Sequence, residues 1–190
     1  EAEADLRQAI AQRYDDQRRA RTYGMHFLDY FPHRELGIVL YRQGKLEASM
    51  RELETSLSRE KSAKAELYLD RVRKDWIEQQ QRDRIPPVIT IDSPAPDALV
   101  QGFTVTVRGS ARDDTFVKSI QVDGIPVRID LSAPQIPFAV EVPLRRSGNT
   151  SEVLATDLTG RQSRVKLEVN SDREGPVLGI QSAEPGGRLK

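Results

Sequence analysis

The chain has 190 residues, enough for one or two domains, and its 29 basic residues balance its 29 acidic ones. With no net charge, no overall field indicates a nucleic-acid partner, and the absence of cysteine excludes disulfides, a thiolate nucleophile and cysteine-ligated zinc. No apolar run approaches the roughly 18 residues that a membrane-spanning helix needs, so we expect no direct membrane span.

The first predicted element is a helix over residues 3–28 with a narrow buried stripe. Leu6 and Ile10 lie one helical turn apart, and residues 15–21 are almost wholly charged or polar. An apolar cluster follows and ends just before Pro32. We expect this cluster to be core that packs the first helix on the next two; its members are Tyr23, Met25, Phe27, Leu28, Tyr30 and Phe31.

Two short helices are predicted within residues 32–57, separated by a break at residues 43–45. Pro32 suits the first turn of a helix, and Gly44 suits the left-handed residue that ends one. Gly37 costs about 1 kcal/mol relative to alanine inside a helix, so we expect it to permit a close approach of the second helix. The second helix has apolar residues at helical spacing, namely Leu46, Met50, Leu53 and Leu57.

This helical pair resembles a tetratricopeptide repeat, whose pattern combines a Leu-Gly pair, a turn glycine and small residues in the second helix. The matching positions are Leu36, Gly37, Leu40, Gly44, Leu53 and Leu57, with Leu46 in the place of the usual tyrosine and Ser49 and Ser56 where the family prefers alanine. The aromatic before the Leu-Gly pair and the closing proline of the family are absent. An ordinary helical hairpin, which binary patterning alone produces, is the alternative.

The resemblance implies a site for a protein partner, because the first helix of each tetratricopeptide pair lines the concave groove. Arg34, Ile38, Tyr41 and Arg42 would then face the partner, and the two arginines would clamp a peptide carboxylate. The alternative is that Ile38 and Tyr41 pack inside the helical part. One repeat offers little groove, so the site would gain from oligomerisation, and the sequence does not predict the oligomeric state.

A fourth helix is predicted over residues 62–81, with Ser62 as its N-cap and a polar end typical of a capping helix in a solenoid. The prolines Pro86 and Pro87 end it and stiffen the junction that follows. We expect Ile85 and Val88 to be buried against both neighbouring domains and to hold them at a fixed angle. The apolar face of this helix consists of Leu67, Leu69, Val72, Trp76 and Ile77.

From residue 88 onward the apolar residues alternate with polar ones, which predicts about seven short strands and a β-sandwich. Turn signals separate the strands, one of them at Asp113 and Asp114. The segments 107–114, 120–124 and 155–160 resemble a bacterial immunoglobulin-like domain of the type found along exported and surface proteins. That resemblance implies a spacer, an adhesion unit or, in some cases, a sugar binder.

One internal repeat is visible, because the segment 83–91 recurs at 172–180, one sandwich length further along the chain. The predicted domains are therefore a helical domain at 1–84, a sandwich at 85–171, and at 172–190 the linker and first strand of a truncated second sandwich. Chance similarity is the alternative explanation of the repeat.

No catalytic site, metal site or cofactor is predicted. His26 and His33 are the only histidines, whereas zinc needs three or four ligands. No serine-hydrolase, zinc-protease or phosphate-loop motif is present, and no facing pair of carboxylates stands out. A calcium-binding site at one end of the sandwich remains an alternative, with Asp113, Asp114, Asp123 and Asp157 as its candidate ligands. Aspartate is also the usual turn residue at strand ends, so these residues can also serve as turns.

These observations predict a multidomain α plus β chain that acts as a non-enzymatic protein–protein interaction module or assembly scaffold of the bacterial cell envelope. We expect it to be exported, periplasmic or associated with the outer envelope, with a lipid anchor in a preceding segment as one route to that location. One alternative is a carbohydrate- or polymer-binding module, against which the aromatic content of the sandwich argues, since it has phenylalanines but no tryptophan or tyrosine. The other is an accessory region of a larger exported enzyme.

Overall fold

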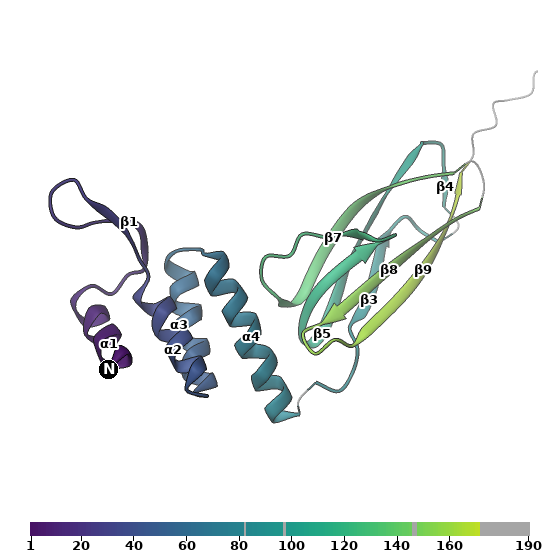
Figure 1. The fold of residues 1–190 in the computed structure, drawn as a ribbon. Helices are drawn as coiled ribbons and strands as arrows, with labels where there is room; N and C mark the ends of the chain where they lie inside the picture. The colour runs from purple at the N-terminus through teal and green to yellow at the C-terminus, as the bar shows by residue number, and fades with distance from the viewer. Residues whose placement is uncertain (82, 97, 146–147, 172–190) are drawn as a thin grey trace, which may run out of the picture.

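The computed structural model describes residues 1–81, 83–96, 98–145 and 148–171. The described residues form four helices and a small β-hairpin, followed by the strands of a large sheet. Figure 1 shows the helices and the hairpin at the N-terminal end and the curled sheet after them. The chain is therefore a mixed α and β protein, with helices first and long strands afterwards, as the change of apolar period at residue 88 predicts. The predicted second sandwich at 172–190 lies outside the described residues.

The helices pack in chain order, each one against the next. Pro32 begins the second helix and Gly44, with a φ of +74°, lies at the break after it, as predicted. Ser62 caps the fourth helix, since its hydroxyl accepts a hydrogen bond from the Ala65 N–H at 3.2 Å. The helices are α1 (Ala2–Gln12), α2 (Pro32–Arg42), α3 (Leu46–Arg59) and α4 (Ala63–Gln80).

The contact between α2 and α3 is close because Gly37 has no side chain. A Cβ placed there would lie 2.7 Å from Leu53 Cγ. On α3, Ser49 is fully buried and its hydroxyl donates a hydrogen bond to the Gly37 carbonyl oxygen at 2.7 Å. The expected role of Gly37 is confirmed. Any helical hairpin with small facing residues packs this way, so the tetratricopeptide resemblance stays a prediction.

The prediction of one helix over residues 3–28 is wrong. Helix α1 ends at Gln12, and a two-stranded hairpin of β1 (Gln17–Arg21) and β2 (Phe27–Tyr30) follows it. The polar run at 15–21 offers no apolar stripe that could hold a helix against a core. Instead, Gly24 takes a left-handed φ of +66° and lets the chain turn back.

The large sheet curls because β5 is long and belongs to both of its layers. The first half of β5 pairs with β3 and β7, and its second half pairs with β8, which in turn pairs with β9. The prediction of a turn at Asp113 and Asp114 is wrong, since β5 continues through them with a shift of register. The strands are β3 (Val88–Ser93), β4 (Leu99–Val100), β5 (Thr104–Val122), β6 (Ile125–Pro126), β7 (Ala133–Pro143), β8 (Asn149–Asp157) and β9 (Gln162–Ser171).

One apolar core lies between the two layers of the curled sheet. It is aliphatic except for Phe138, in agreement with the low aromatic content of the chain. Alternate residues of β5 point into it, which is the period of a half-buried strand. Its fully buried members include Val107, Val117, Val122, Val153 and Ala155.

Helix α4 is joined to the sheet through the buried carboxylate of Asp70. One carboxylate oxygen accepts hydrogen bonds from the Ser132 N–H at 3.2 Å and the Ser132 hydroxyl at 2.5 Å, and the other accepts one from the Lys118 ammonium group. Near it, the Arg73 guanidinium donates to the Ser132 carbonyl oxygen at 3.1 Å and lies 4.4 Å from the centre of the Phe116 ring. These contacts attach one face of α4 to the sandwich.

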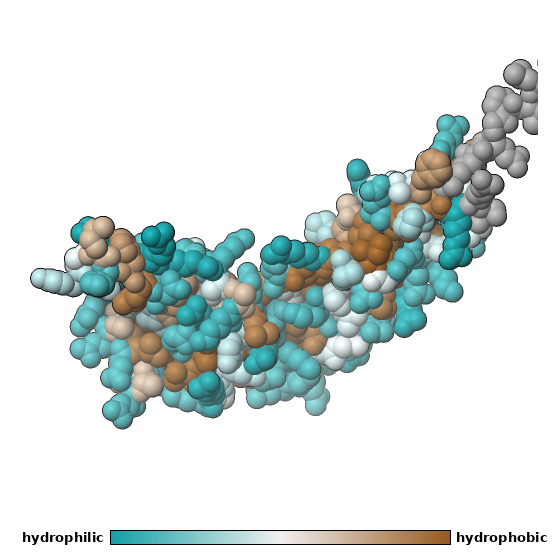
Figure 2. Space-filling view, turned by 45° about the horizontal axis from the view of Figure 1, so that its top comes forward, coloured by the Kyte–Doolittle hydropathy of each residue, from teal (hydrophilic) through white to brown (hydrophobic). Residues whose placement is uncertain are grey.

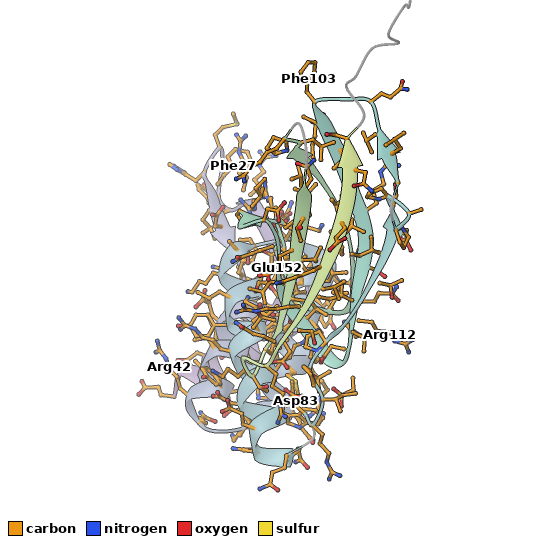
Figure 3. All side chains as sticks on the ribbon, turned by 90° about the vertical axis from the view of Figure 1, so that its right-hand side faces the viewer. Phe27, Arg42, Asp83, Phe103, Arg112 and Glu152 are labelled. Atoms are coloured by element: carbon orange, nitrogen blue, oxygen red, sulfur yellow. The ribbon has the colours of Figure 1, made fainter. Side chains whose placement is uncertain are left out.

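A second connection forms at Asp83, in the segment between α4 and β3 (Figure 3). Its buried carboxylate accepts a hydrogen bond from the Thr159 hydroxyl and lies 3.4 Å from Arg161 Nε. Arg161 also donates to the main-chain oxygens of Asp83 and Arg84, at 2.8 and 3.0 Å. Polar groups, therefore, connect the two parts of the chain here.

The prediction that Ile85 and Val88 are buried against both domains is wrong. Their side chains are 52% and 61% exposed, whereas Pro87 between them is buried. Val88 is the first residue of β3 and lies on the strand face opposite Ile89 and Ile91, which pack against the core of the sheet. A fixed angle between the two parts stays a prediction, now attributed to Asp70 and Asp83.

Asp83 also gives the junction an expected dependence on pH. Burial raises the pKa of Asp83 above that of an ordinary aspartate, and the nearby Asp157 and Asp113 carboxylates act in the same direction, against the hydrogen bond from Thr159 and the charge of Arg161. The folded protein therefore binds this proton more tightly than the unfolded chain does. It follows that this group adds stability as the pH falls through its raised pKa.

We expect Asp83→Asn to remove that contribution. In urea unfolding at a series of pH values, the free energy of unfolding of the wild type should rise relative to the variant as the medium is acidified. Parallel pH profiles for the two proteins would contradict the assignment to Asp83.

Candidate functional site: a protruding hairpin

The hairpin of β1 and β2 exposes a group of large apolar side chains. Tyr23 is 91% and Met25 is 80% exposed, and Phe27 and Leu28 are about half exposed. Figure 1 shows the hairpin projecting from the helices, and Figure 2 shows hydrophobic side chains gathered at that end of the molecule. We refer to residues 22–28 as the hairpin tip.

The prediction that this apolar cluster is core is wrong for most of its members. Phe31 is buried and Tyr30 is partly buried, but the four apolar side chains of the tip, Tyr23, Met25, Phe27 and Leu28, are exposed. The sequence does carry a signal for the hairpin, because Tyr23, Met25 and Phe27 alternate around Gly24 with the period of a strand.

Short hydrogen bonds close the loop of the tip. The Thr22 N–H donates to the His26 carbonyl oxygen at 2.9 Å, and the Arg21 guanidinium donates to the Gly24 carbonyl oxygen at 2.8 Å. Behind the loop, Arg21 pairs with Phe27 across the two strands. The loop therefore has a defined shape although its apolar side chains have no core to enter.

The base of the hairpin is attached to α2 through Asp16. This aspartate is 3% exposed, and its two carboxylate oxygens accept hydrogen bonds from the His33 and Arg34 N–H groups at 3.0 and 3.2 Å. These N–H groups belong to the first turn of α2, where a negative charge is favourable. Nearby on β1, Ala20 is fully buried as well.

Two further side chains attach the base to the end of α1 and to the connection between α3 and α4. The Tyr30 hydroxyl lies 2.8 Å from the Ala9 carbonyl oxygen and 3.0 Å from that of Arg13, at the end of α1, and burial raises the pKa of Tyr30. The Arg18 guanidinium donates to the Lys61 carbonyl oxygen at 2.7 Å and pairs with Glu60 at 3.2 Å. A fixed base with an apolar tip is preorganised for contact with another surface.

The hairpin is also basic. Residues 17–30 contain three arginines and one aspartate, Asp29. The Arg19 guanidinium lies 5.6 Å from the centre of the Phe27 ring, which places a positive charge beside the apolar tip.

The residues predicted to bind a protein partner do not form one exposed surface. Ile38 is 4% exposed and belongs to the core shared by α2, α3 and α4. The Tyr41 hydroxyl donates to Asp75 at 2.7 Å, and this bond is the main reason that the pKa of Tyr41 is raised. The packing alternative therefore holds for both, which corrects the prediction that Ile38 faces a ligand.

The two arginines of that predicted site differ from each other. Arg34 covers the Phe31 ring at 4.0 Å and its Nε lies 2.9 Å from a Glu35 carboxylate oxygen, whereas Arg42 is exposed. Figure 3 shows Arg42 and Phe27 far apart in the helical part of the molecule. Binding of a partner through Arg34 and Arg42 stays a prediction.

Three of the four aspartates considered for calcium accept hydrogen bonds from the backbone. Asp113 and Asp123 each accept from a main-chain N–H, at 2.8 and 2.7 Å, and Asp157 accepts from three successive ones at 2.7–2.9 Å. Asp114 is exposed. Within the described ranges, no three histidine, aspartate or glutamate side chains are placed to hold a metal ion. Asp113, Asp123 and Asp157 thus stabilise the local backbone.

Neither a protein family model nor a curated protein sequence matches the chain. Similar solved structures include fibronectin(III)-like modules of CbhA from Clostridium thermocellum, with 14% identity and a TM-score of 0.37 over 52% of this chain and 54% of that one. They also include a modular endo-β-1,4-mannanase from Cellulomonas fimi, with 26% identity and a TM-score of 0.28 over 45% of this chain and 18% of the mannanase.

A polysaccharide lyase is similar at 15% identity and a TM-score of 0.33, over 54% of this chain and 14% of the lyase. The chain thus spans about half of the first structure and less than a fifth of the other two. TM-scores below 0.5 do not establish a common fold, so no function is transferred from these proteins. No helix in the described part of the chain has the length and apolar character needed to span a membrane.

Proposed function

We propose that this chain is a non-enzymatic interaction module of the bacterial cell envelope, in which the hairpin tip is the contact surface and the sandwich is a spacer. The observation that carries the proposal is an exposed apolar tip on a base fixed by buried groups. Tyr23 and Met25 are almost fully exposed, while Asp16 and Ala20 behind them are almost fully buried. Large exposed apolar patches on folded proteins are typical of interaction sites.

The spacer role is supported by the elongated arrangement in Figure 1, where the hairpin and the far end of the sheet lie at opposite ends. The contacts of Asp70 and Asp83 connect these ends through α4. The two-layered sheet, in which β5 crosses between layers, supports the immunoglobulin-like assignment of the spacer. Such a spacer would also suit an accessory region of a larger exported enzyme.

Carbohydrate binding by the sandwich finds less support. Stacking on sugars needs exposed aromatic rings, and residues 85–171 contain no tryptophan or tyrosine. Phe138 is buried in the core, and the Phe116 ring is covered by Arg73. Phe103 is the exposed aromatic residue of this part, and one ring does not make a platform.

The proposal can be tested by site-specific photo-crosslinking in the envelope of the source organism. A photoreactive residue at Met25 should give adducts with an envelope component, because the tip is the contact surface. The matched position is Val88, which is apolar and 61% exposed on the sandwich, and it should give none. Equal labelling from both positions, or no adduct from position 25, would refute the proposed contact.

A further inference from the structure

We propose that the partner of the hairpin tip is an anionic lipid surface, with Tyr23 and Met25 entering the headgroup layer. This inference rests on the proposed function, since it names the partner of the same tip. The tip combines three properties that a lipid surface would recognise: an apolar end, basic side chains directly behind it, and a small convex shape.

The end of the hairpin tip is apolar, as insertion into a lipid surface requires. Tyr23 and Met25 flank Gly24 at the turn and are the two most exposed apolar residues of the hairpin, at 91% and 80%. Tyrosine suits a boundary between lipid and water because its ring is apolar and its hydroxyl is polar. Methionine is flexible enough to fit between acyl chains. Phe27 and Leu28, about half exposed, lie just behind them.

Positively charged side chains lie directly behind the apolar end of the tip. Arg19 lies against the Phe27 ring, and Arg21 bonds to the Gly24 carbonyl oxygen, so both guanidinium groups are close to the tip. Asp29 is the single acidic residue of the segment 17–30. If the tip enters the headgroup layer, the arginines lie at the depth of the phosphates, where basic residues are attracted to anionic lipids.

The small size of the hairpin tip favours a lipid surface over a protein as its partner. A stable protein interface buries roughly 800 Å² on each partner and uses about 20–30 residues a side. The tip comprises only residues 22–28, and the hairpin behind it is engaged with the helices through Asp16, Arg18 and Tyr30. Insertion into a lipid surface needs no such area, because each apolar side chain that leaves water contributes separately.

The absence of cysteine makes a direct test possible. Met25→Cys in the full chain is labelled with an environment-sensitive fluorophore and mixed with vesicles of phosphatidylglycerol and phosphatidylcholine in equal parts. We expect a blue shift and protection from an aqueous quencher, both weakened by salt and both absent with pure phosphatidylcholine. The matched label at Val88→Cys should not respond.

A second experiment measures co-sedimentation with the same vesicles. The double variant Tyr23→Ser with Met25→Ser should bind at least about tenfold more weakly than wild type, since both inserted side chains become polar. The control, Val88→Ser with Leu99→Ser, removes two apolar side chains of the sandwich that are 61% and 64% exposed, and this variant should bind normally. Unchanged binding by the tip variant would overturn the inference.

The two proposals fail in distinguishable ways. If the vesicles give no response but position 25 crosslinks to an envelope protein, the lipid inference is wrong and the contact function stands. The same holds if position 25 crosslinks to a second copy of the chain. If position 25 gives no adduct and no vesicle response, both proposals are wrong.

Discussion

Replacing Gly109 with alanine should unfold the sandwich or cost at least about 3 kcal/mol of its stability, since overpacking against backbone is among the most damaging core changes. Gly109 on β5 pairs with Ile91 on β3. A Cβ at position 109 would lie 2.1 Å from the Thr90 carbonyl oxygen and 3.1 Å from Ile91 Cα. Both are backbone atoms, so the clash is relieved only if β3 moves away from β5.

The effect can be measured by urea unfolding of Gly109→Ala, followed by circular dichroism in the strand region. The matched control is Ser110→Ala at the next position of β5, which is partly buried and should change the stability by less than about 1 kcal/mol. A Gly109→Ala cost as small as that of the control would mean that β3 does not approach β5 as closely as described.

The second large effect is expected at the contact between α2 and α3. Leu53 is fully buried and its side chain covers Gly37, so Leu53→Ala should cost about 2–5 kcal/mol through lost burial and the cavity that remains. Unfolding of the helical part can be followed by the fluorescence of Trp76, the single tryptophan, which packs against the same core. A cost below about 1 kcal/mol would show that this contact contributes little.

A double-mutant cycle tests the closeness of this contact. Gly37→Ala alone should be destabilising despite the better helix propensity of alanine, because its Cβ would lie 2.7 Å from Leu53 Cγ. In the double variant with Leu53→Ala the new methyl group has room. We therefore expect the double variant to lose at least about 0.5 kcal/mol less than the sum of the single losses. Additive losses would contradict the close approach.

Much of the helical part follows from local chemistry and was predictable. Pro32, Gly44 and Ser62 act through their own backbone or through an N–H group a few residues away, so their roles can be recognised without a structure. The same holds for the alternation along β5, where the buried face follows the period of a strand. The exposure of Val88 follows from the same alternation, since it lies opposite Ile89 and Ile91 on β3, whereas the exposure of Ile85 in the linker depends on how the two parts of the chain pack.

The exposure of the hairpin tip could not be predicted from the apolar pattern of the sequence. An apolar cluster near a helical pair predicts core, because apolar side chains are stabilised by leaving water. Whether they can leave water depends on where the neighbouring elements lie, and Asp16 and Tyr30 hold the hairpin so that Tyr23 and Met25 extend beyond them. The partners of these anchoring groups are residues of α1 and α2, which local periodicity does not connect to the hairpin.

By itself the sequence determined that this protein has helices followed by strands, where its helices begin or break at Pro32, Gly44 and Ser62, and that alternate residues of the long strand β5 are buried. The tertiary structure decided which polar groups join the two parts and which apolar residues remain exposed. Asp70 meets Lys118 and Ser132, and Asp83 meets Thr159 and Arg161, across long stretches of chain. Apolar burial follows a local period, whereas pairing between distant polar groups depends on the packing of whole elements.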